Sequence, residues 1–270
     1  MAADLTGIIN EGEFFSQHYL QELLERDLKA MAAEQSELSK TLEQLRGMGR
    51  DFFRAVGEAA ELSSPARLYE LSHPFQVKLA EALGYQYQSG AWVPVGDWAL
   101  PVIHAVERAG VPYAVVLEGR FRREQDAVLE LPVLGRFAES AMEAGKKTPP
   151  VTVNLSKALT HLFAGDQAPR WALILSGADI ILAERARWGK GRYLRFDLAE
   201  LLARRDTSAL TICAALLSRA TLSPADGAPI HDSLDERSHK HAHGVSSDLK
   251  FAAREAVELL GNEYVYWERN

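Results

Sequence analysis

The chain has 270 residues, of which 47% are hydrophobic and 25% charged; these are ordinary globular values, and they exclude a disordered or collagen-like chain. Its 37 acidic residues outnumber its 30 basic ones, giving a net charge of −7, so any contact with nucleic acid would need a local basic patch. The single cysteine, Cys213, excludes an internal disulfide, and no run approaches the roughly 18 apolar residues of a membrane span.

Residues 1–62 are predicted to be a helical arm. The first residues lack the basic-then-apolar profile of a signal peptide, so we expect a cytoplasmic protein. From Glu13 to Leu45 apolar residues recur every three or four positions, which is typical of one face of an amphipathic helix or helical pair. That face would pack on its own domain, self-associate into an oligomer or dock a partner, and packing on its own domain is the favoured interpretation.

Residues 63–205 are predicted to form a mixed α/β domain. Ser63, Ser64 and Pro65 mark a helix start, and Gly84 marks its end. Further helices are expected over 155–163 and 198–205. Strands are expected over 91–95, 100–106, 113–117, 171–175, 180–183 and 193–196, with hairpin turns at 108–112 and 176–179.

Residues 206–270 are predicted to return to helix. The periodic segments are 209–219 and 247–260, and a polar loop is expected between them, over 222–244. The fold class that follows is α+β, with a central sheet flanked by the N-terminal helical arm and by C-terminal helices.

One set of candidate catalytic residues lies around a predicted hairpin. Asp97 precedes a strand, Glu118 ends the apolar strand 113–117, and Arg120 follows two residues later. Metal-dependent nucleases use this order: the two acids converge on Mg²⁺, and a cation on the same strand face polarises the phosphate or the attacking water. A helix carboxylate, Glu70 or Glu81, would complete the site. On spacing alone, the favoured interpretation is that Asp97 and Glu118 are solvated residues at strand ends.

A basic stretch at 185–195 is the candidate DNA-binding segment. Cations alternate there with aromatic residues, an arrangement that tracks phosphates and stacks on bases. Its candidate contacts are Arg185, Arg187, Trp188, Lys190, Arg192 and Arg195. The equally favoured alternative is a solvated hairpin whose arginine stems cover apolar surface.

A histidine cluster is the third candidate site. His239, His241 and His243 alternate, so an extended chain would place all three on one face, where zinc could bind. The segment is rich in Asp, Ser and Lys and has no cysteine, which favours a polar loop or a hydrogen-bonded cluster instead.

Several segments together resemble the N-terminal nuclease-like region of bacterial restriction enzymes. Arg170-Trp-Ala-Leu-Ile-Leu-Ser-Gly177 and Arg192-Tyr-Leu-Arg-Phe-Asp-Leu198 are similar to two strands of the N-terminal domain of type I restriction subunits. Four segments, in their order along the chain, resemble more closely the N-terminal region of large single-chain restriction–modification proteins. That family is similar to type IIG enzymes and to phage-defence adenine DNA methyltransferases such as those of DISARM. The four segments are 13–20, 194–201, 233–242 and 247–263.

The resemblance implies a restriction-endonuclease-like sheet that engages DNA beside a methyltransferase domain or subunit. S-adenosylmethionine would bind only to that methyltransferase, because this chain has no Asn-Pro-Pro motif. Carried over by position, the nuclease core is Asp97, Glu118 and Arg120. The family has lysine where Arg120 stands and proline where Gly96 stands, and both departures are consistent with a degenerate core.

Two functions follow as expectations. The first is a DNA-engaging, Mg²⁺-dependent endonuclease module of a restriction–modification or phage-defence enzyme. The second is a non-catalytic interaction or scaffold module, with a degenerate nuclease core, that docks a DNA methyltransferase. Neither requires a membrane.

Overall fold

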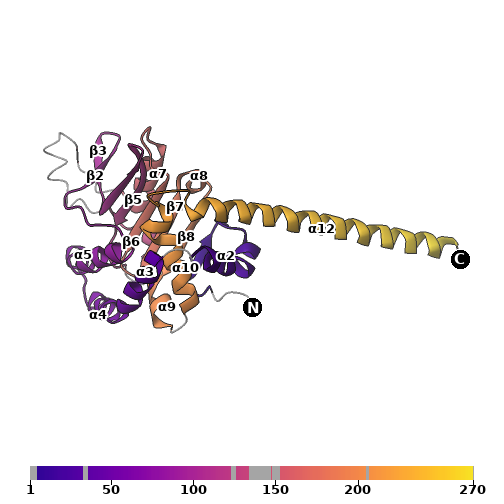
Figure 1. The fold of residues 1–270 in the computed structure, drawn as a ribbon, viewed down its shortest axis with the longest axis horizontal. Helices are drawn as coiled ribbons and strands as arrows, with labels where there is room; N and C mark the ends of the chain where they lie inside the picture. The colour runs from indigo at the N-terminus through magenta and orange to yellow at the C-terminus, as the bar shows by residue number, and fades with distance from the viewer. Residues whose placement is uncertain are drawn as a thin grey trace.

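The fold is a mixed six-stranded sheet covered by helices on both faces, with a small second sheet beside it (Figure 1). The computed structural model describes residues 5–32, 36–122, 126–133, 147, 153–204 and 207–269. In spatial order the strands of the large sheet are β1 (Ile8–Glu11), β8 (Tyr193–Asp197), β7 (Asp179–Glu184), β6 (Trp171–Ser176), β5 (Val111–Glu118) and β4 (His104–Arg108). Strands β2 (Trp92–Val95) and β3 (Trp98–Pro101) form the second sheet.

The helices precede, interrupt and follow the strands along the chain. Those before the sheet hairpins are α1 (Gln17–Glu22), α2 (Leu24–Ala32), α3 (Ser36–Gly47), α4 (Gly49–Ala60) and α5 (Pro65–Ala82). A 3₁₀ turn, η1 (Val128–Glu130), and α7 (Leu155–Ala164) lie between β5 and β6, and α8 (Arg185–Trp188) follows β7. The remaining helices are α9 (Leu198–Ala203), α10 (Thr207–Leu217), α11 (Arg219–Leu222) and α12 (Ile230–Arg269).

The central strands β6 and β7 are buried on both faces, as their uninterrupted apolar sequences predict. Alternate side chains enter two different hydrophobic clusters: Leu173 and Leu182 pack with α3, α5 and α10, whereas Ile174 and Ile181 pack with α7 and the β2–β3 hairpin. Strands β5 and β6 are parallel, and every other neighbouring pair is antiparallel. The predicted α+β class and both predicted hairpins are confirmed.

Three sequence predictions were wrong. The segment 1–62 is not entirely helical, because β1 pairs with β8 at the edge of the large sheet. The expected strand 100–106 is divided between β3 and β4, which belong to different sheets. The expected polar loop over 222–244 is helical from Ile230 onward, since α12 begins there and continues to Arg269.

The apolar face of the N-terminal helices is buried in the core of the same chain. Tyr19, Leu24 and Leu45 are at most 1% exposed, and they share one cluster with residues of β6 and α10. One hydrophobic core therefore takes side chains from all three segments that the sequence delimits. This face is not free to bind a second copy of the chain.

The base of α12 is fixed to the sheet and to the N-terminal helices by ionic and polar contacts. The Arg170 guanidinium lies 2.7 Å from the Asp232 carboxylate, and Arg237 lies 3.1 Å from Asp27. The backbone N–H of Ser16 donates to the Ser238 hydroxyl. The C-terminal half of α12 projects away from the body (Figure 1). Over the described ranges, no helix is both long enough and apolar enough to span a bilayer.

His231, in the first turn of α12, is held neutral by its surroundings. It is 2% exposed, its ring lies 4.9 Å from that of Trp171, and its Nε2 is 2.8 Å from the Leu216 carbonyl oxygen. Burial lowers the pKa of His231 to about 4 from an ordinary 6.5. Its Nδ1 meets no hydrogen-bond partner among the described residues, so a second ring proton would have no acceptor there.

We therefore expect the free energy of unfolding to fall as the pH drops from about 6.5 toward about 4, because only the unfolded chain takes up a proton on His231 in that window. The full loss would be about 3 kcal/mol. Urea unfolding of His231→Gln, which keeps a donor for Leu216, should show a shallower pH dependence. Equal slopes in the wild type and in His231→Gln would contradict the assignment.

Candidate functional site

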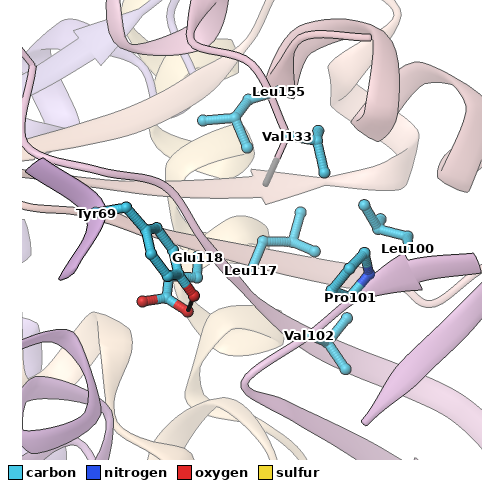
Figure 2. A pocket seen from close by; sticks show the side chains of 8 residues that line it. All are labelled: Tyr69, Leu100, Pro101, Val102, Leu117, Glu118, Val133 and Leu155. Carbon is cyan, nitrogen blue, oxygen red and sulfur yellow. Dashed lines mark hydrogen bonds between the residues drawn. The ribbon is translucent and has the colours of Figure 1, made fainter. Parts of the chain in front are cut away.

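The carboxylate of Glu118 lies at the end of β5, where it meets the face of α5 that turns toward the sheet (Figure 2). Its side chain is only 8% exposed. The Tyr69 hydroxyl donates to Oε2 at 2.8 Å, and Nδ1 of His73 is 2.8 Å from Oε1. Both carboxylate oxygens therefore already have partners from one helix, and these contacts satisfy the buried charge.

The chain beyond Glu118 is held tightly between α5 and the β6–β7 hairpin. The Gln76 side-chain amide donates to the Gly119 carbonyl at 2.6 Å, and the Gly119 N–H donates to Leu175. A Cβ on Gly119 would come within 2.5 Å of the Ser176 hydroxyl oxygen, so only glycine fits there without displacement. The backbone after β5 is thus packed too closely to leave a groove along it.

Arg120 does not share a site with Glu118. The prediction placed both on one strand face, but β5 ends at Glu118, so the alternation of a strand does not extend to residue 120. Arg120 is 7% exposed; it donates to the Phe121 carbonyl and forms an ion pair with Asp126 at 3.3 Å. Its charge is neutralised inside the fold.

Asp97 lies at the opposite end of β3 from the Glu118 region. It is exposed in the turn between β2 and β3, whereas the strands paired with β5 are β6 and β4, which begins at His104. Pro101, at the other end of β3, lines the cavity beside Glu118 (Figure 2). Since a strand rises about 3.3 Å per residue, Trp98, the residue after Asp97, is about 10 Å from Pro101.

The cavity beside Glu118 is small. Its volume is about 10 Å³, which accommodates about one water molecule. Apart from Tyr69 and Glu118 its lining is apolar: Leu100, Pro101, Val102, Leu117, Val133 and Leu155. A phosphodiester does not fit in this space.

The other predicted carboxylates of α5, Glu70 and Glu81, are exposed and do not line this cavity. The helix residues that reach Glu118 are Tyr69 and His73, which the sequence analysis missed. They lie four residues apart on the helix face that also carries the buried Gln76. Polar residues at helical spacing within a buried stripe were the signal that could have identified them.

The basic stretch 185–195 is largely committed to contacts within the chain. Arg187 contacts Asp235 and lies 3.0 Å from Glu184, and it donates to the Phe14 carbonyl at 2.6 Å. Arg195 lies 3.0 Å from the fully buried Asp179.

The aromatic residues of this stretch also pack inward. The Trp188 indole N–H donates to the Thr160 hydroxyl, and its ring packs against Phe163 and Tyr193. Arg185 and Lys190 are exposed and Arg192 is half-buried, so the cationic surface left for DNA is small. These contacts favour the structural interpretation of the stretch.

The histidine cluster lies on a helix, which removes the basis for the extended zinc arrangement. Successive helical residues are about 100° apart, so His239 and His241 point about 200° apart. His239 pairs with Asp235 at 3.3 Å, and the ring of His241 lies 4.8 Å from that of His18. His243 is also within α12. Across the described ranges, no three His, Cys, Asp or Glu residues are grouped so that they could hold a metal ion.

Cys213 is not placed for nucleophilic chemistry. It is buried within α10, and burial raises the pKa of its thiol to about 12. The thiolate, which is the reactive form, is therefore essentially absent at neutral pH.

Comparisons of the chain with protein-family models, with curated proteins and with solved structures found no match.

The internal contacts of Arg187 predict a stability role that a DNA ligand would not have. Arg187→Met keeps the aliphatic stem but leaves two acids without this partner, so the free energy of unfolding should fall by about 3 kcal/mol. Lys190→Met removes an exposed charge from the same stretch and should change it by less than about 0.5 kcal/mol. Urea denaturation measures both; if Arg187→Met were as mild as Lys190→Met, Arg187 would not be the structural contact described here.

Proposed function

We propose that this chain is a non-catalytic interaction module of a bacterial restriction–modification or phage-defence assembly, in which a nuclease-like body holds a projecting helix. The proposal rests on the contacts that the Glu118 carboxylate makes inside the fold. Its Oε2 accepts from the Tyr69 hydroxyl and its Oε1 lies beside Nδ1 of His73, so the carboxylate acts as a structural link between β5 and α5.

The other expected catalytic residues support the same proposal. Arg120 is buried against Asp126, and Asp97 is separated from Glu118 by the length of β3. A two-carboxylate Mg²⁺ site needs oxygens that converge on one ion and leave room for its bound waters. A cavity of about 10 Å³ lined mostly by apolar side chains does not fit that requirement.

The interaction role is supported by the C-terminal half of α12. Every side chain described from Asp248 to Leu260 is exposed, and so are Tyr264, Tyr266 and Trp267. Tyrosine and tryptophan are the residues most enriched at the energetic centres of protein interfaces. A projecting amphipathic helix is marginally stable in water alone, so it needs a surface to pack on.

The binding partners in this proposal are those that the resemblance to restriction–modification proteins implies. They are a DNA methyltransferase domain or subunit, which would bind S-adenosylmethionine itself, and the DNA that it modifies. Arg185 and Lys190 are the exposed cations of the basic stretch and would supply a weak, salt-dependent contact to phosphate. Such an assembly would work in the cytoplasm.

A Mg²⁺-dependent endonuclease is the second candidate, because Glu118 does end a buried strand and has His73 beside it. For cleavage, the Glu118 carboxylate would have to break its contacts with Tyr69 and His73. It would then have to bind one metal ion together with a second carboxylate. Nothing in the packing of α5 on β5 favours that rearrangement.

Incubation of the full chain with supercoiled plasmid, with and without Mg²⁺ or Mn²⁺, tests the proposal. We expect no metal-dependent nicking by the wild type, and the same result for Glu118→Ala. Cleavage that requires the metal and disappears in Glu118→Ala, while the exposed control Glu61→Ala retains it, would overturn the non-catalytic assignment in favour of the endonuclease.

A further inference from the structure

The exposed half of α12 has one apolar face and one charged face. At 100° per residue, Leu249, Ala253, Ala256, Leu260, Tyr264 and Trp267 fall within one stripe of the helix, which we call the α12 stripe. Its large members are strongly exposed, from 65% at Tyr264 to 81% at Trp267. The opposite face carries charges, including the Arg254–Glu258 ion pair at 2.8 Å.

The order of large and small residues along the stripe indicates what covers it. Two alanines occupy its N-terminal half, at 253 and 256, whereas leucine and aromatic residues occupy its C-terminal half. In an antiparallel pair of identical helices centred near residue 258, Ala256 faces Leu260 of the second copy, Ala253 faces the turn that carries Tyr264, and Leu249 faces Trp267. Each large side chain of the C-terminal half therefore meets a smaller one.

A parallel pair would pack poorly by the same comparison. It would place alanine against alanine at 253 and 256, leaving space, and would bring the two copies of Tyr264 and of Trp267 together. Interdigitated packing requires large residues opposite small ones. The flanking Ala252 follows the antiparallel rule as well, since it is level with Tyr264 of the other copy.

We propose that the α12 stripe is a self-association surface on which a second copy of this chain packs antiparallel. This inference rests on the proposed function, since it names the partner of the projecting helix. A two-fold axis near residue 258 makes the contact self-complementary and closed. Because each aromatic side chain buries about 150–250 Å², the two stripes together cover on the order of 1,000 Å², which is the lower limit for a specific interface.

Because α12 is anchored at its first turns and projects outward, the globular parts of the two copies do not collide in such a dimer. The ion pairs of Arg170 with Asp232 and of Arg187 with Asp235 hold the helix at its first turns, and its outer half extends from the body (Figure 1). Residues 249–267 span about 27 Å at 1.5 Å per residue. An antiparallel pair therefore places the two bodies at opposite ends of the shared helical segment.

Sedimentation of the full chain over a range of concentrations is the first test. The wild type should form a concentration-dependent dimer, and Leu260→Glu should raise its dissociation constant at least about 30-fold, as expected at the centre of an interface. Phe251→Glu is the matched control: Phe251 is as exposed as Leu260, at 71%, but lies on the charged face. It should leave the dimer unchanged.

Disulfide trapping tests the orientation. In the antiparallel pair, position 253 of one copy lies level with position 263 of the other, so Ala253→Cys/Glu263→Cys should form a covalent dimer on mild oxidation. Ala253→Cys alone should not, because about 15 Å separates the two cysteines along the axis. The native Cys213 is buried and does not interfere.

Three results would overturn the inference. They are a wild type that remains monomeric at every concentration, a dimer unaffected by Leu260→Glu, and efficient crosslinking by Ala253→Cys alone. The plasmid assay decides the non-catalytic role separately, so a monomer that does not cut DNA would leave that role standing with a different partner on α12.

Discussion

The contacts of the Arg187 guanidinium join three parts of the chain that the sequence separates widely. From α8, it donates to the Phe14 carbonyl of the N-terminal segment and contacts Asp235 on α12, and it also forms an ion pair with Glu184 at the end of β7. Its guanidinium also lies 4.3 Å from the centre of the Phe14 ring. A guanidinium is planar and has five N–H donors, so it can contact several acceptors at once. The compact ammonium group of a lysine would not suit this position. The direction in which α12 leaves the body depends on this contact.

In the proposed non-catalytic module, the Glu118 carboxylate has a structural role, which is to link β5 to α5. A carboxylate at the end of a buried strand is costly unless its charge is satisfied, and metal enzymes satisfy it with a cation. Here Tyr69 and His73 of α5 contact both oxygens. Arg120, two residues later, forms an ion pair with Asp126. Of the residues expected to form a catalytic core, Glu118 is therefore the one that holds α5 against the sheet, and among the described residues the outer half of α12 is strongly exposed.

Local pattern was enough to predict much of the sheet but not the site. The apolar runs of β6 and β7 and the turn at Gly177 specify a buried hairpin, and Pro65 specifies the start of α5. The helix over 230–244 escaped prediction because polar and charged residues dominate its sequence, and its base is fixed by tertiary ion pairs that sequence spacing does not reveal. Tyr69 escaped for the same reason: its partner Glu118 is 49 residues away.

Thermal unfolding of the full chain at increasing Mn²⁺ tests most directly whether Glu118 is structural, because a metal bound only by the folded state raises the unfolding midpoint. We expect Mn²⁺ to shift the unfolding midpoints of the wild type and of Glu118→Gln equally. We also expect Glu118→Gln to be less stable than the wild type without metal, since Tyr69 and His73 lose a charged partner. A Mn²⁺-dependent rise in the wild type that is absent in Glu118→Gln would contradict it and place a metal at this carboxylate.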